Sequence, residues 1–109
     1  MPDIRETNRV CTQITTVKLP AENQQEVLDL MSERARFMAT QPGFVLVKLH
    51  RSKDRSHVVN YIQWQSREQL QAAHHAPEFR KKWQRFAELV EEIEPFLYDV
   101  IHVETATRM

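Results

Sequence analysis

The most constraining feature of this chain is a run of β-branched and aromatic residues at positions 57–66, HVVNYIQWQS. The run lacks Gly and Pro and leads directly into a helix-start signal, so it predicts a strand followed by a helix. Alternation of side chains along the strand places one row on a single face: Val58, Asn60, Ile62 and Trp64. This row is apolar except for one amide, and leaving a buried amide unpaired costs about 1–3 kcal/mol. We therefore expect Asn60 either to find hydrogen-bond partners or to face a cavity.

The hydrophobic pattern of the remaining chain predicts strands at 9–19, 44–50 and 96–104 and helices at 21–40, 66–75 and 77–94. Ser66 followed by Gln69 is typical of a capping box, and Pro77 suits a first helical position. Pro95 is expected to end the last helix. This order of elements predicts an α+β fold, the ferredoxin-like split βαβ arrangement, with a four-stranded antiparallel sheet and helices on one face. The uncovered sheet face carries apolar residues in every strand, so we expect a homodimer that packs sheet to sheet.

Composition narrows the class of protein. A length of 109 residues suits a single domain, expected at 9–109 after a flexible N-terminus at 1–8. Lys+Arg and Asp+Glu both number 15, so no basic excess favours nucleic acid, and no apolar run is long enough for a membrane span. The polar N-terminal residues do not resemble a signal peptide, and we expect a cytoplasmic protein.

Two rare residue types exclude further classes. Gly43 is the only glycine, and a phosphate-cradling loop needs several, which excludes Rossmann and P-loop nucleotide sites. Cys11 is the only cysteine, so an internal disulfide and a zinc–cysteine cluster are excluded. A small hydrophobic role in a strand is the expected one for Cys11, with a nucleophilic thiol as the alternative.

The motif VVNYxQWxS at 58–66 follows QPGFV at 41–45 and precedes His74, Pro77 and Phe79. In these residues the chain resembles the antibiotic biosynthesis monooxygenase family of small dimeric α+β barrel proteins. The pattern is most similar to the branch that oxidises polyketide anthrones to quinones without a cofactor. The resemblance implies a dimer whose two sheets close into a barrel, and it places Asn60 and Trp64 at the Asn and Trp that line the pocket of that branch.

The resemblance implies a small aromatic substrate, O2 as co-substrate, and neither cofactor nor metal. Asn60 is expected to hydrogen-bond the developing oxyanion, Trp64 to offer a ring face and an indole N–H, and His74 to carry a proton. The residues expected to contact substrate share an apolar character: Val58, Ile62, Leu70, Phe79 and Trp83. Each of these assignments has a structural alternative, namely a core amide, a core indole, an exposed helix-end imidazole, and an aromatic stripe that packs on the sheet. The other four histidines are expected to be structural or solvated.

Two positions depart from the family pattern. Leu70 stands where the polyketide branch often has a Tyr, so a phenolic proton relay is not available there. Trp83 stands where haem-degrading relatives have an iron-ligating His, so haem is not expected. Two alternatives remain open at this stage: a non-catalytic dimeric domain that binds a small aromatic ligand, and an isomerase or cyclase on the same scaffold.

Overall fold

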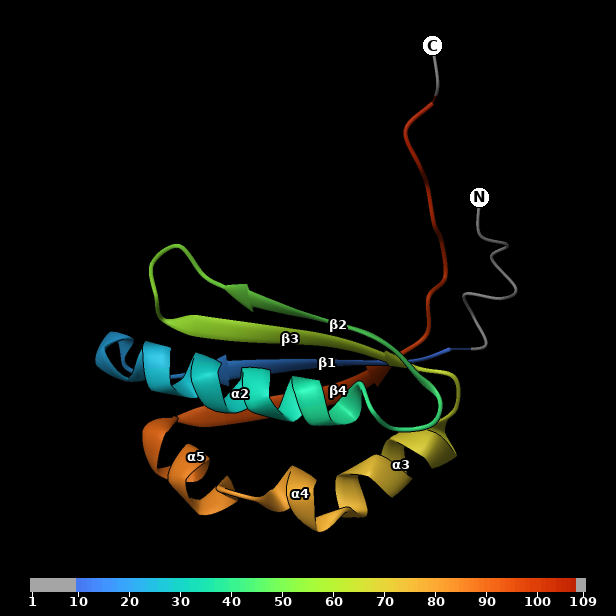
Figure 1. Cartoon of the computed structure of the whole chain (residues 1–109). Coiled ribbons are helices and arrows are strands. Elements are labelled where there is room, and N and C mark those ends of the chain that lie inside the picture. The colour runs from blue at the N-terminus through green and yellow to red at the C-terminus, as the bar shows by residue number, and fades with distance from the viewer. Residues whose placement is uncertain (1–9, 108–109) are drawn as a thin grey trace.

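The four strands form one antiparallel sheet in the order β2-β3-β1-β4, seen in a computed structural model that describes residues 10–107 (Figure 1). The strands are β1 (Cys11–Lys18), β2 (Phe44–Arg51), β3 (His57–Trp64) and β4 (Glu92–Tyr98). The helices are η1 (Ala21–Asn23), α2 (Gln24–Met38), α3 (Arg67–His75), α4 (Pro77–Arg80) and α5 (Trp83–Leu89). The predicted ferredoxin-like α+β fold is confirmed. The predicted flexible segment 1–8 lies outside the described residues.

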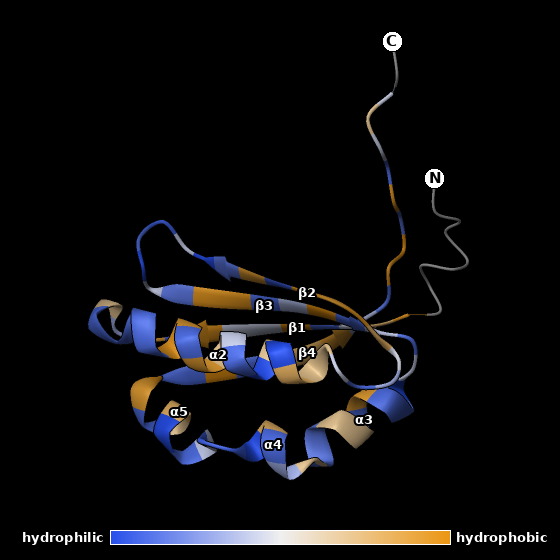
Figure 2. Ribbon diagram, in the orientation of Figure 1, coloured by the Kyte–Doolittle hydropathy of each residue, from blue (hydrophilic) through white to orange (hydrophobic). Residues whose placement is uncertain are grey.

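The helices cover one face of the sheet, and Figure 2 shows apolar residues in the strands and helices that meet there. Strand β3 lies between β1 and β2, and its alternating row faces the helices, with Val58 and Trp64 fully buried. In the register with β1, Trp64 lies opposite Cys11 and Asn60 opposite Thr15. The predicted β3 row is therefore correct in both extent and direction.

Two local features lie side by side where β2 begins and β3 ends, at the start of α3. Gly43 has a φ of 83°, a region that other residues rarely adopt. Its backbone carbonyl accepts a 2.7 Å hydrogen bond from the backbone N–H of Gln65. Ser66 caps the start of α3 as predicted, because its hydroxyl oxygen accepts a hydrogen bond from the backbone N–H of Gln69 at 3.2 Å. A β-carbon at position 43 would overlap the end of the Gln69 side chain, which would have to move, and the positive φ at this position disfavours other residue types in any case.

The C-terminal third differs from the prediction in two ways. The single helix expected at 77–94 is broken into α4 and α5, with Lys81 extended and Lys82 in the left-handed region at a φ of 64°. The last strand runs from Glu92 to Tyr98 rather than 96–104, and Pro95 lies inside it instead of ending a helix. A proline is tolerated there because β4 is an edge strand with unpaired groups on its outer side.

No helix of residues 10–107 covers the second sheet face, and aromatic side chains of β4 project from it. Phe96 is 57% exposed and Tyr98 47% exposed, and their rings meet edge to face with centroids 6.5 Å apart. The neighbouring strands add the half-buried side chains of Ile14, Val59 and Tyr61 to the same face by register. Across residues 10–107 no helix has the length and apolar character that a membrane crossing requires.

Candidate active site

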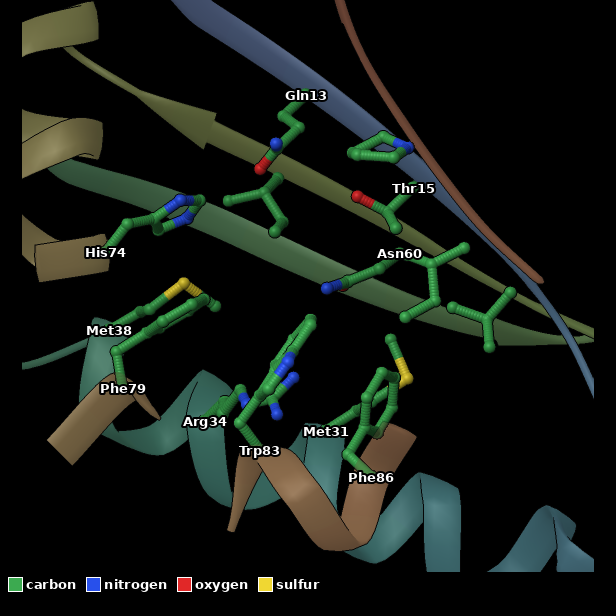
Figure 3. A pocket seen from close by; sticks show the side chains of 14 residues that line it. Gln13, Thr15, Met31, Arg34, Met38, Asn60, His74, Phe79, Trp83 and Phe86 are labelled. Atoms are coloured by element: carbon green, nitrogen blue, oxygen red, sulfur yellow. The ribbon is translucent and has the colours of Figure 1, made fainter. Parts of the chain in front are cut away.

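The hydrophobic core is divided into two clusters, and a cavity of about 210 Å³ lies where they separate (Figure 3). The first cluster includes Val58 and Met31, and the second includes Ile62, Trp64 and Met38. Residues of the sheet and of all the α-helices line the cavity: Gln13, Thr15, Val17, Met31, Arg34, Met38, Asn60, Ile62, His74, Phe79, Trp83, Phe86, Ile93 and Pro95. Asn60 stands between the two clusters on β3, so the polar interruption of the apolar row coincides with the gap in the core.

Asn60 forms part of the sheet side of this cavity. It is only 9% exposed, and its Oδ1 atom has no hydrogen-bond partner. Its amide nitrogen points into the cavity in Figure 3, and Thr15 and Gln13 lie beside it on the same wall. These two residues come from β1 because Thr15 pairs with Asn60 and Gln13 with Ile62 in the register. The strand wall therefore offers a patch of amide and hydroxyl groups within an otherwise apolar surface.

His74 enters the cavity from the last turn of α3. Its ring stacks on Phe79, with centroids 4.3 Å apart, and its Nε2 atom is buried without a hydrogen-bond partner. Burial is the main cause that lowers the pKa of His74, and the positive charges of His75 and Arg34 lower it further. At neutral pH the imidazole is therefore uncharged, and a neutral imidazole has a nitrogen that can accept a proton.

Arg34 lies on the helix side of the cavity, between Met31 and Met38 on one face of α2. Its guanidinium carbon lies 5.4 Å, 4.8 Å and 4.6 Å from the ring centroids of Phe79, Trp83 and Phe86. Burial lowers the pKa of Arg34 from its ordinary value, although an arginine stays charged under all ordinary conditions. The cavity thus has a cation opposite its amide wall.

The structure brings five of the eight predicted site residues together around one cavity: Asn60, Ile62, His74, Phe79 and Trp83. The other three, Val58, Trp64 and Leu70, lie in the core clusters that flank the cavity and are not part of its lining. Trp64 is completely buried, meets the ring of Phe44 edge to face at 5.3 Å, and has an indole N–H with no partner. Any part that Trp64 plays in the cavity is therefore exerted through its packing on Ile62 and Met38 in this conformation.

Sequence reasoning did not identify Arg34, Gln13 or Thr15 as site residues. Arg34 interrupts the apolar stripe of α2 between Met31 and Met38, as Asn60 interrupts the row of β3, and that parallel was a usable signal. Gln13 and Thr15 are identified only by the β1–β3 register. Within residues 10–107, no group of three or more His, Cys, Asp or Glu side chains is arranged to hold a metal ion.

The fold and cavity define a small ferredoxin-like α+β protein with an apolar pocket that contains a few polar groups. The family model for antibiotic biosynthesis monooxygenase matches residues 11–85, and the chain belongs to this family. It is 30% identical over 97 residues to the tetracenomycin-F1 monooxygenase of Streptomyces glaucescens, an alignment that covers 88% of this chain and 86% of that protein. The family resemblance inferred from the sequence is confirmed.

Solved structures support the fold. A variant of SnoaB, a cofactor-independent oxygenase from Streptomyces nogalater, superposes with a TM-score of 0.78 at 22% identity, covering 87% of this chain and 96% of that one. A putative antibiotic biosynthesis monooxygenase from Nitrosomonas europaea superposes with a TM-score of 0.79 at 12% identity, covering 87% and 93%. At these identities the likeness concerns the fold alone.

Proposed function

We propose that this chain is a cofactor-independent monooxygenase that uses O2 to oxidise an electron-rich aromatic substrate, of the anthrone or hydroquinone type found in polyketides, to a quinone. The observation that carries the proposal is an apolar cavity with unpaired polar groups: Asn60 and His74 both line it, and each has a buried polar atom without a partner. Unpaired buried groups are costly, and a substrate that pairs with them recovers that cost. The relationship to the tetracenomycin-F1 monooxygenase supports the same reaction class.

In this mechanism His74 acts first as a base. Its neutral imidazole removes a proton from the acidic CH2 of an anthrone, and the negative charge is delocalised onto the ring oxygen. The Asn60 amide donates a hydrogen bond to that oxygen as its charge develops, which stabilises the anion in a cavity that excludes most water. An aromatic substrate in this state is a sufficient electron donor for O2.

The anion then transfers one electron to O2, and recombination of the radical pair forms a carbon–oxygen bond. The resulting peroxide takes the proton from His74 and becomes a hydroperoxide. His74 removes the second proton of the original CH2 as the O–O bond breaks and hydroxide leaves, and the hydroxide takes this proton back from His74 to form water. Overall, CH2 and O2 become C=O and H2O, so the four electrons that O2 accepts come from the substrate.

We also propose that two copies associate through the helix-free sheet face. Phe96 and Tyr98 are about half exposed on that face, and no element within the described part of one chain covers them. Packing against a second sheet removes these rings from water. The cytoplasmic location, the absence of a cofactor and the absence of a nucleic-acid or membrane partner remain predictions from the sequence.

Oxygen consumption with 1,8-dihydroxyanthrone tests the enzymatic proposal. The expected result is one O2 consumed for each quinone formed, above the rate of autoxidation in buffer, with one atom of ¹⁸O2 in the quinone and the other in water. The Asn60→Ala protein at the same concentration is the matched control for nonspecific surface effects. Binding without O2 uptake would contradict the proposal in favour of a binding domain, and conversion without O2 uptake would favour an isomerase or cyclase.

A further inference from the structure

Arg34 is a charged side chain in a place where a charge needs a partner. It is half-buried and lines the cavity, yet it makes no hydrogen bond or salt bridge to any of residues 10–107 within the usual distances. Burial of an unpaired guanidinium is unfavourable because the protein interior replaces water poorly as a solvent for charge. The site is therefore incomplete as it stands.

The neighbouring acids make no hydrogen bond or salt bridge to Arg34 among residues 10–107, and Glu33 acts on it through its charge alone. Glu33, the next residue in α2, is held by Lys82 at 3.2 Å, and Glu26 on the same helix is held by Arg85 at 2.6 Å. None of the described residues that line the cavity is Asp or Glu. His74 is neutral at pH 7 because burial lowers its pKa. The cavity therefore has a net positive charge from Arg34 that nothing within its lining balances.

The aromatic rings around Arg34 hold it without using its donors. Phe79, Trp83 and Phe86 lie within 5.4 Å of the guanidinium carbon, a separation at which ring faces attract a cation. The guanidinium also has five N–H groups, and none of them donates a hydrogen bond to an acceptor among residues 10–107. The rings thus surround a hydrogen-bonding fork whose acceptor the described residues do not supply.

We propose that Arg34 binds an anionic oxygen of the aromatic substrate, so that this protein selects ligands that carry an acidic group. A planar fork matches a carboxylate through two parallel hydrogen bonds and an ionised phenol through one. Asn60 on β3 and Arg34 on α2 line opposite sides of the same cavity (Figure 3), which gives the ligand a direction: its acidic group at the helix wall and its reacting carbon near Asn60 and His74. The orientation of the ligand in this assignment rests on the proposed function, whereas the binding of an anion by Arg34 does not.

Calorimetric titration with matched naphthalene probes tests the assignment without any turnover. The probes are 2-naphthoic acid, its neutral analogue 2-naphthamide, and 2-naphthol measured on both sides of its ionisation. We expect the acid to bind about ten to a hundred times more tightly than the amide, the range given by hydrogen bonds to charged groups. The two pairs of probes distinguish the anionic groups that Arg34 could bind. Tighter binding of ionised than of neutral 2-naphthol identifies a phenolate, and tighter binding of the acid than of the amide identifies a carboxylate.

Variants of α2 separate a role in recognition from a role in folding. Arg34→Gln should reduce binding of the acid to the level of the amide while binding of the amide changes less than about twofold. Arg36→Gln is the matched control, because Arg36 is an exposed arginine on the same helix outside the cavity lining, and it should leave both affinities unchanged. Should Arg34→Gln not fold, Arg34→Lys retains the charge and should retain part of the preference.

Several results would overturn the assignment: equal affinity of the wild-type protein for all charged and neutral probes, no binding of any probe, or equal weakening of acid and amide in Arg34→Gln. Because these measurements use no O2, they are independent of the oxygenase test. If the protein prefers charged probes but oxidises no substrate, the anion site is supported and the proposed function is refuted. If the protein oxidises its substrate but binds charged and neutral probes equally, the proposed function is supported and the anion site is refuted.

Discussion

Replacement of Asn60 by Ala separates catalysis from folding with unusual clarity, because the Asn60 Oδ1 atom has no partner to lose. If the amide donates to the developing oxyanion, its removal should lower kcat by about 10²–10³, the cost of one such donor where it has been measured. The free energy of unfolding should change little, since no intramolecular hydrogen bond of Oδ1 is broken and the removed atoms border an existing cavity. The Tm of Asn60→Ala should therefore stay within about 4–8 °C of the wild-type Tm, which is the shift that a change of about 1 kcal/mol produces in a domain of this size.

Gln63 provides the matched control. It lies on the same strand, is also 9% exposed, and faces the opposite side of the sheet, where its amide nitrogen donates to Thr12 at 3.2 Å and to Tyr61 at 3.0 Å. Gln63→Ala should lower stability by about 1–2 kcal/mol through the lost hydrogen bonds and leave kcat per folded molecule unchanged. The assay is quinone formation and thermal unfolding on the same samples.

Asn60→Leu sharpens the test because leucine is close in size and apolar. It removes an unpaired amide, which favours the folded state by up to about 1–3 kcal/mol, and it extends the apolar row without interruption from Val58 to Trp64. The expected protein is at least as stable as wild type and catalytically inactive. An Asn60→Ala or Asn60→Leu protein that keeps wild-type kcat would refute the assignment of Asn60 as an oxyanion donor.

Three further predictions concern the dimer, the imidazole and the turn. Phe96→Glu should convert a dimer to a monomer of 13.0 kDa in light scattering, whereas a wild-type protein that is already monomeric at micromolar concentration would contradict the interface. The pKa of His74 is lowered in the folded state, so the unfolded state binds a proton more readily than the folded state below pH 6.5. The free energy of unfolding should therefore fall as the pH drops through this range. The kcat should fall in the same range because the protonated imidazole is no longer a base. His74→Gln should abolish the activity and this part of the pH dependence of stability, and an unchanged profile would show that another group titrates. Gly43→Ala should lower stability by about 1–2 kcal/mol from the positive φ alone, measured by urea unfolding, and Gln69→Ala in the same chain should recover the part that comes from the clash.

The β3 row was predictable because strand alternation and one polar interruption are local properties of ten consecutive residues. Burial of Asn60 followed from that row, which left open whether the amide would find partners or face a cavity, and the N-cap of α3 at Ser66 followed from a short capping pattern. The ferredoxin-like order followed from the sequence of element types. The wider cavity lining did not, because it depends on which residues of β1 lie opposite β3 and on which face of α2 meets the sheet.

The errors in the C-terminal third have a common cause. Lys81 and Lys82 are ordinary helix formers, so no local signal in the sequence indicates the break between α4 and α5, at which Lys82 is left-handed and on both sides of which the helices contact α2. Its side chain is also held by Glu33 across that interface. Pro95 is a helix breaker in isolation, and only the edge position of β4 makes it compatible with a strand. Both outcomes depend on contacts far apart in the sequence.

The division of the core has a thermodynamic consequence. The apolar layer between sheet and helices is discontinuous at the cavity, so a flat aromatic ligand that binds there, as proposed, would restore the contacts that the two clusters lack. Ligand affinity can then be measured through protein stability, because a ligand that binds only the folded state raises the free energy of unfolding. A ligand present at a hundred times its Kd adds about 2.7 kcal/mol. Collections of aromatic acids can therefore be ranked by the rise in melting temperature alone, before any substrate or product is known.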